Sequence, residues 1–146
     1  MEFRGTVFAR SSKRGATGVP GEREIGALNP KRELRLLQAT GWNALEPGTL
    51  NLRVSAEVVD SLLTLTPLWA EEADDVAYPA PYEHIPRLRK GWLYYAGHTS
   101  GDVQRLNVLV RRARNPLRDR VEVYAGVSIR HTLGLDDGDP LQITVA

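Results

Sequence analysis

The stretch Glu46-Pro47-Gly48-Thr49-Leu50-Asn51-Leu52-Arg53-Val54 decides the fold, because a Pro-Gly turn leads directly into a short apolar strand. Proline fixes its own φ and glycine can adopt φ > 0, so the strand begins abruptly after the turn. Side chains alternate between the faces of a strand, which puts Thr49 and Asn51 together on the face opposite the apolar residues. Their neutral oxygens can hold a hard cation or phosphate oxygens. A turn followed by a half-exposed edge strand explains the same residues without a ligand.

The composition is typical of one globular domain. The chain has 146 residues, of which 42% are hydrophobic and 25% charged, and we expect a single domain over residues 1–146. Nineteen Lys and Arg against eighteen Asp and Glu give a formal charge of +1. This balance gives no reason to expect binding to nucleic acid or to an anionic membrane, so any basic function must be local.

Two absences in the sequence narrow the class of protein further. The chain has no cysteine, which excludes disulfides, thiolate zinc sites and a cysteine nucleophile. Its first residues lack an apolar signal core, and no stretch approaches the roughly 18 continuous apolar residues of a membrane helix. We therefore expect a soluble, cytoplasmic protein, monomeric and without a membrane partner.

Hydrophobic periodicity predicts six strands and three short helices. Alternation predicts strands over residues 2–10, 49–54, 92–98, 104–112, 119–124 and 141–145. Helices are expected after Asn29-Pro30, with Leu34, Leu37 and Leu36 as candidates for its buried stripe, after Ser55, and over 127–133 before Gly134. Residues 69–90 show no clean period, and we expect no regular element there. A mainly β chain of this order predicts a small closed, mostly antiparallel β-barrel with two or three short inserted helices, since closure removes exposed sheet edges.

A long glycine-rich segment follows the first strand. Residues 11–30 include Lys13, Arg14, Gly15 and Gly18. Glycines let backbone N–H groups approach an anion closely, and the cations would complement phosphate. The spacing matches neither a Walker A loop nor G-x-G-x-x-G. A phosphate-binding loop and a simple disordered segment both remain open.

Other marked residues have structural explanations beside functional ones. The histidines His98 and His131 are isolated in sequence, so hydrogen-bonded structural roles are favoured over a metal site. A run of arginines would bind phosphates if it lined one surface, and is otherwise a solvated face; it comprises Arg111, Arg112, Arg114, Arg118 and Arg120. Four aromatic residues suit either a barrel core or stacking on a flavin ring; they are Trp42, Trp92, Tyr94 and Tyr95.

Two segments of the chain resemble the archaeal CTP-dependent riboflavin kinases. Pro47-Gly48-Thr49-Leu50-Asn51-Leu52, after a helix ending in Gly41-Trp42, is similar to the P-G-T-L-N-V segment of that family. The tail of the chain is similar to the family's closing block. The similarity runs from Arg114-Asn115-Pro116 through Val121-Glu122-Val123-Tyr124-Ala125 to Leu133-Gly134-Leu135-Asp136-Asp137-Gly138-Asp139. The first motif is fairly specific, whereas L-G-L-x-D-G-D also ends other small barrels.

The resemblance implies a cradle-loop barrel that transfers the γ-phosphoryl group of CTP to the 5′-hydroxyl of riboflavin, giving FMN. Thr49 and Asn51 would then lie at Mg²⁺ and the phosphates, and Glu122 would face the accepting hydroxyl as the base. This agrees with the residues, because phosphoryl transfer needs positioning, charge neutralisation by a metal and a carboxylate at the nucleophile. The alternative is a noncatalytic barrel that binds a nucleotide, a flavin or nucleic acid.

Overall fold

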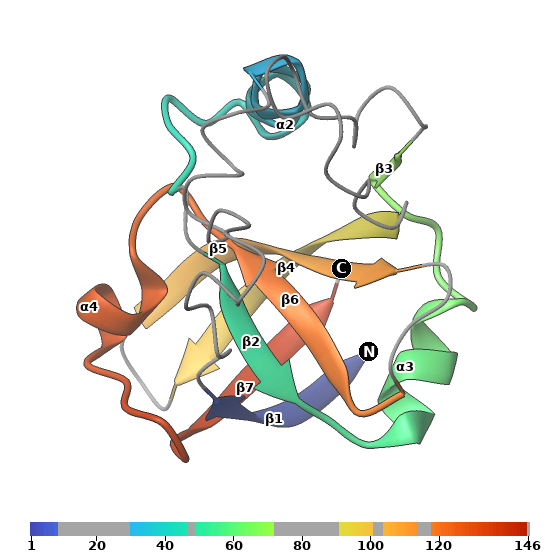
Figure 1. The fold of residues 1–146 in the computed structure, drawn as a ribbon, viewed down its shortest axis with the longest axis vertical. Coiled ribbons are helices and arrows are strands. Elements are labelled where there is room, and N and C mark those ends of the chain that lie inside the picture. The colour runs from blue at the N-terminus through green and yellow to red at the C-terminus, as the bar shows by residue number, and fades with distance from the viewer. Residues whose placement is uncertain (9–29, 47–48, 72–90, 101–103, 114–117, 146) are drawn as a thin grey trace, which may run out of the picture.

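The computed structural model describes residues 1–8, 30–46, 49–71, 91–100, 104–113 and 118–145. Strands dominate this part of the chain (Figure 1). They are β1 (Glu2–Phe8), β2 (Leu50–Arg53), β3 (Trp69–Ala70), β4 (Gly91–Ser100), β5 (Gln104–Ala113), β6 (Arg120–Tyr124) and β7 (Pro140–Val145). The described helices are α2 (Pro30–Thr40), α3 (Ala56–Leu62) and α4 (Ile129–Leu133).

The strands form one antiparallel sheet that curls strongly on itself (Figure 1). Their order across the sheet is β3-β4-β5-β6-β2-β1-β7. β4 and β5 pair along their whole lengths, and β4 also pairs with β7 through Ala96, Gly97 and His98. The prediction of a mainly β, antiparallel chain with short inserted helices is confirmed, in the form of a curled half-barrel. The finer prediction, a closed cradle-loop-type barrel, stays a prediction.

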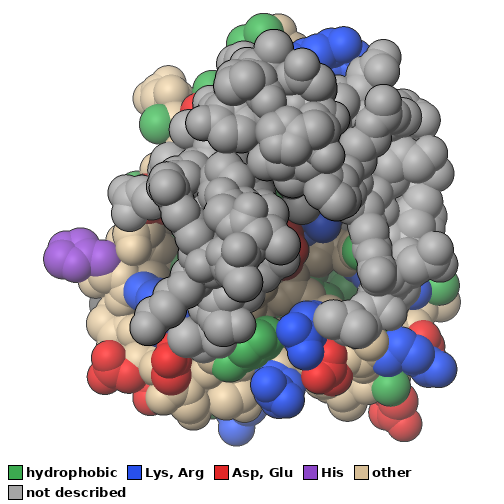
Figure 2. Space-filling model, in the orientation of Figure 1, with side chains coloured by type: hydrophobic (Ala, Val, Ile, Leu, Met, Phe, Trp, Pro, Cys, Tyr) green, Lys and Arg blue, Asp and Glu red, His purple; other side chains and the backbone are tan. Residues whose placement is uncertain are grey.

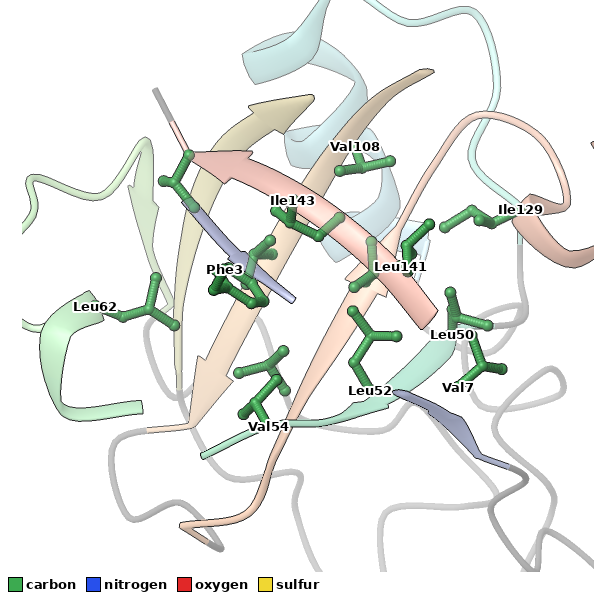
Figure 3. Close-up of a cluster of buried hydrophobic side chains, with 14 of the residues drawn as sticks. Phe3, Val7, Leu50, Leu52, Val54, Leu62, Val108, Ile129, Leu141 and Ile143 are labelled. Atoms are coloured by element: carbon green, nitrogen blue, oxygen red, sulfur yellow. The ribbon is translucent and has the colours of Figure 1, made fainter. Parts of the chain in front are cut away.

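The hydrophobic core lies on the inner face of the curled sheet (Figure 3). Burial alternates along β1 and along β7, so each strand contributes every second side chain. Leu62 of α3 and Ile129 of α4 approach the cluster from opposite sides in Figure 3, and both are buried. Burying one such side chain contributes about 1.5–3 kcal/mol. The two short helices thus help to hold the sheet in its curled shape.

Serine side chains cap the start of both helices: α3 begins directly after Ser55, as predicted, whereas α4 begins at Ile129, two residues after the predicted start at 127. The Ser55 side chain accepts a hydrogen bond from the Val58 N–H at the start of α3, and Ser128 does the same for His131 in α4. Gly134 ends α4 in the left-handed conformation, with φ of 63°. α3 is shorter than its apolar pattern suggests, because Leu63 lies beyond its last residue and is exposed.

α2 lies over the outer face of the sheet, at the top of Figure 1. It begins at Pro30, as predicted, but the predicted buried stripe is partly wrong. Leu34 is 56% exposed, whereas Leu36 is 1% exposed. Arg32, one turn before Leu36, shares its face and is also buried. Apolar periodicity could not show this, because a buried cation becomes acceptable only when a distant partner neutralises it.

β1 and β2 approach each other closely at Gly5. A Cβ placed on Gly5 would lie 2.9 Å from the Leu52 Cβ and 3.2 Å from the Arg53 carbonyl oxygen. Backbone and Cβ atoms cannot move aside cheaply, so glycine is required at this position. This approach sets the register of the two strands, in which Phe8 lies opposite Asn51.

The two-residue strand β3 is a feature that the sequence analysis missed. Trp69 pairs with Leu93 of β4, and Ala70 pairs with Trp92. Two residues are too few to show a period of two, so residues 69–90 looked irregular throughout. β3 delivers the next residue, Glu71, into the interior, where it has no exposed surface.

Candidate functional site

A row of polar side chains crosses the outer face of the sheet. Asn51 of β2 lies directly opposite Glu122 of β6, and Glu122 lies opposite Arg111 of β5. The neighbours of these residues along each strand fill the core, so all three side chains project to the other face. The structure therefore places two of the predicted site residues, Asn51 and Glu122, side by side. Thr49, the third, comes immediately before β2 and is half-buried.

Two contacts of the Glu122 carboxylate meet at one of its oxygens. The Tyr124 hydroxyl donates a hydrogen bond of 2.9 Å to Glu122 Oε2, and Arg111 Nη1 lies 3.6 Å from the same oxygen. The side chain of Glu122 is 22% exposed. A hydroxyl donor and a guanidinium beside a carboxylate hold it in a defined position, and its oxygens can still accept hydrogen bonds from a ligand.

Glu71 lies behind this carboxylate and binds two buried arginines. Its Oε1 accepts a hydrogen bond of 2.6 Å from Arg111 Nε, and its Oε2 accepts one of 2.8 Å from Arg32 Nε. Arg32 Nη2 in turn donates to the Tyr124 hydroxyl at 2.9 Å. The contacts thus close a ring through Glu71, Arg32, Tyr124, Glu122 and Arg111, which we call the ion-pair ring. Two cations and two anions make it formally neutral.

Protonation within the ion-pair ring follows from burial and charge. Burial raises the pKa of the Tyr124 phenol well above its usual range, so its hydroxyl stays protonated and donates a hydrogen bond to Glu122. Burial alone would lower the pKa of Arg32, but the charges and hydrogen bonds of Tyr124 and Glu71 raise it instead. The same balance raises the pKa of Arg111, with Tyr124, Glu122 and Glu71 as the partners. Both arginines are therefore permanent cations.

Asn51 differs from its neighbours in the polar row. It is 7% exposed, and its carboxamide has no hydrogen-bond partner in the part of the chain that the structure describes. Buried polar groups in native proteins are nearly always hydrogen-bonded, and leaving one without a partner costs about 1–3 kcal/mol. A carboxamide held in this state next to a carboxylate is a candidate ligand-binding group.

Comparisons with known proteins do not identify this site. No protein-family model matches the chain, and no curated protein matches it. The similarity to the riboflavin kinases therefore rests on the two motifs. None of the described helices has the length and apolar character needed to cross a bilayer.

Among the described residues, few charged side chains are placed to bind a metal ion at this site. Within the described ranges, no three His, Cys, Asp or Glu side chains gather as a metal-binding group. Thr49 and Asn51 offer neutral oxygens, and the adjacent Glu122 already contacts Arg111. Mg²⁺ commonly takes one or two protein ligands and completes its shell with water and substrate phosphates. The residues therefore fit a Mg²⁺ ion that arrives with a nucleotide better than one held by the protein alone.

The described members of the arginine run do not line one surface, so the condition for phosphate binding by this run is not met among them. Arg111 is buried in the ion-pair ring, and Arg112 is buried under α3, where its Nε donates to the Val59 carbonyl oxygen at 2.8 Å. Arg118 pairs with Asp60, and Arg120 pairs with Asp119. The side chains of successive strand residues point to opposite faces, so this run cannot line one surface. Arg114 lies outside the described residues.

Charges on the surface are mixed in sign. The Arg120 hydrogen bond lowers the pKa of Asp119, which keeps this carboxylate ionised beside the arginine. Arg53 and Arg120 also stack on the Phe8 ring, with 4.9 and 5.3 Å from each guanidinium carbon to the ring centre. Figure 2 shows Lys and Arg side chains (blue) and Asp and Glu side chains (red) interspersed along the lower edge of the face in view. This pattern gives no support to a phosphate-binding surface built from the arginine run.

The remaining candidate residues are described by the structure only in part. The described ranges do not include the predicted loop residues Lys13, Arg14, Gly15 and Gly18, so the phosphate-binding loop stays a prediction. His131 is exposed on α4. The strand β4 carries His98, Trp92, Tyr94 and Tyr95, whose side chains are not described.

The one described aromatic of that group packs beside the site. Trp42 is half-buried against the small cluster of Leu36, Leu109 and Tyr124, on the outer face of the sheet. This placement favours packing under α2 as its role.

Three functional candidates escaped the sequence analysis: Arg32, Glu71 and Tyr124. Tyr124 carried a signal, because it lies two residues after Glu122 and must share its face of β6. Arg32 lies four residues before Leu36 on α2, so it could have been placed on the same helix face. Glu71 offered no signal, since only the pairing of β3 with β4 brings it to the arginines.

Proposed function

We propose that this protein is a riboflavin kinase-like phosphotransferase, which transfers the γ-phosphoryl group of CTP to the 5′-hydroxyl of riboflavin. The observation that carries the proposal is the pair of opposite residues Asn51 and Glu122, in which a buried carboxamide without a hydrogen-bond partner among the described residues lies beside a carboxylate. The same residues carry the motif resemblance to the riboflavin kinases. A closed cradle-loop barrel is part of this proposal.

Each residue has a defined chemical task in the proposed reaction. Glu122 accepts the proton of the attacking hydroxyl, and Tyr124 and Arg111 hold its carboxylate in place. Asn51 and Thr49 would hold the nucleotide phosphates and Mg²⁺ through their side-chain oxygens. The bound Mg²⁺ would neutralise charge on the phosphates. Phosphoryl transfer depends mainly on positioning and electrostatics, so a few fixed groups are sufficient.

A noncatalytic barrel that binds a nucleotide or flavin is the second candidate. One observation favours it: the Glu122 carboxylate already has Tyr124 and Arg111 as partners, as an ordinary structural ion pair would. This candidate predicts ligand binding without turnover.

The experiment that separates the two candidates measures FMN. The purified protein is incubated with riboflavin, Mg²⁺ and either CTP or ATP, and the products are separated by chromatography. We expect FMN with CTP and much less with ATP. A folded protein that yields no FMN with either nucleotide would reject the kinase, and calorimetric binding of riboflavin or CTP in that case would support the noncatalytic barrel.

Replacing Asn51 separates ligand binding from stability. Asn51→Ala removes a buried polar group that has no hydrogen-bond partner among the described residues, so we expect the melting temperature to stay the same or to rise. We expect the affinity for CTP in the presence of Mg²⁺ to fall by about tenfold, the loss of roughly one good hydrogen bond to a charged group. Calorimetry and thermal unfolding measure the two effects. A large fall in the melting temperature with unchanged affinity would show that Asn51 is a structural residue.

A further inference from the structure

The function proposed above uses Glu122 but leaves Glu71, the most buried charged residue in the described part of the chain, without a task. Glu71 has no exposed surface and follows directly after β3. Two routes connect it to Glu122. One runs through Arg111, and the other runs through Arg32 and the Tyr124 hydroxyl.

The distances within the ion-pair ring show how Glu71 affects Glu122. Arg111 Nε lies 2.6 Å from Glu71 Oε1, whereas Arg111 Nη1 lies 3.6 Å from Glu122 Oε2. The first is a short charge-assisted hydrogen bond, and the second is an ion pair beyond hydrogen-bonding distance. Glu71 therefore makes the shorter of these two contacts with Arg111, and Glu122 makes the longer one.

The second route acts on the same carboxylate from the other side. Arg32 binds Glu71 through Nε and the Tyr124 hydroxyl through Nη2, and its guanidinium carbon lies 5.0 Å from the centre of the Tyr124 ring. A guanidinium is planar, so fixing Nε fixes the direction of Nη2. By accepting from Arg32, the Tyr124 hydroxyl is oriented to donate its proton to Glu122.

We propose that Glu71 is a positioning residue for Glu122: it holds Arg111 and Arg32 so that the Glu122 carboxylate is oriented by Tyr124 without being bound tightly by Arg111. This inference rests on the proposed function, since it assigns the carboxylate a reaction to perform. Removing the negative charge at position 71 strengthens the pull of Arg111 on the carboxylate that it already contacts. Glu122 would then turn from the site toward Arg111 and become a poorer proton acceptor.

The test compares turnover in three variants. Glu71→Gln keeps the shape of the side chain but removes its charge. We expect kcat to fall by about 10- to 100-fold, the usual cost of losing a group that orients a functional ligand, with a change below about twofold in the KM for CTP. In the Glu71→Gln/Glu122→Gln double variant we expect the kcat of Glu122→Gln alone, because residues that act as a unit are not additive. Glu71→Asp retains the charge and should recover part of the loss.

Arg112→Lys is the matched control, since Arg112 is also buried but lies under α3 and contacts no residue of the ion-pair ring among the described contacts. We expect it to lower stability without lowering kcat. Independent losses that multiply in the double variant would overturn the proposal, and so would an unchanged kcat in Glu71→Gln. If Glu71→Gln does not fold, Glu71→Asp combined with Glu122→Gln provides the same test of additivity.

A crystal structure of the Glu71 variant distinguishes failure of this inference from failure of the proposed function. We expect the distance from Arg111 Nη1 to Glu122 Oε2 to shorten from 3.6 Å to below about 3.2 Å, into hydrogen-bonding range. This shortening would support the positioning role of Glu71 even in a protein that makes no FMN. An unchanged distance would overturn it, whatever the activity.

Discussion

Glu122→Gln should lower kcat for FMN formation by about 10²- to 10⁴-fold, the range in which a positioned base contributes to catalysis. Glutamine has the shape of glutamate, and its carbonyl oxygen can still accept the Tyr124 hydrogen bond, so the local packing is preserved. What it loses is the ability to take a proton. The affinity for CTP should change little, because the proposed contacts to the nucleotide are made by Asn51 and Thr49. Steady-state kinetics and calorimetry measure the two quantities separately.

Asp119→Asn is the control for this variant. Asp119 immediately precedes β6 and forms an exposed ion pair with Arg120, so the substitution removes a carboxylate near Glu122 in sequence without removing any contact of the ion-pair ring that the structure describes. Exposed ion pairs contribute only about 0–1 kcal/mol, and we expect turnover close to that of the unmodified protein. Equal, small losses in both variants would mean that Glu122 is not the base.

Leu52→Ala should lower the free energy of unfolding by about 2–5 kcal/mol, a large part of the roughly 5–15 kcal/mol that holds a domain together. Leu52 has no exposed surface and lies in the middle of β2, among the core side chains in Figure 3. The cost depends on how far the surroundings can close the cavity. Gly5, which faces the Leu52 Cβ from β1, has no side chain to move into the space. Urea unfolding, with the midpoint compared at unchanged m-value, measures the loss.

Leu34→Ala removes the same atoms from the surface of α2. Leu34 is 56% exposed, so we expect a change within about 0.5 kcal/mol. A loss at position 34 as large as that at position 52 would contradict the placement of the core on the inner face of the sheet.

Local sequence patterns were sufficient to predict most of the described elements. Period-two alternation located β1, β6 and β7, and the residues Ser55 and Gly134 marked the start of α3 and the end of α4. These signals are local, because they depend on turn chemistry and on burial of one strand face. β3 escaped, since its two residues are held in place by β4 rather than by a pattern of their own.

The candidate site was predictable only in part, for a related reason. Alternation showed that Asn51 and Glu122 each lie on the polar face of a strand, but strand order and register decide that they meet. The ion-pair ring depends on charges from separate elements that neutralise one another. Arg32 and Glu71 would each be expected at the surface if considered alone, because a single buried charge is unfavourable. Burial of such a pair is a property of the assembled fold.

The position of β1 between β2 and β7 also limits how quickly the chain can fold. β7 pairs with the first strand at its register from Glu2↔Thr144 to Thr6↔Pro140, so the two ends of the described chain must meet before the sheet is complete. Contacts between residues so distant in sequence require closure of a very long loop, whose entropic cost is met before the contact forms. Proteins dominated by such pairings typically fold in milliseconds to seconds, more slowly than helical bundles of equal size. During synthesis on the ribosome, β1 leaves the exit tunnel before β2 but obtains its second neighbour only when β7 has emerged.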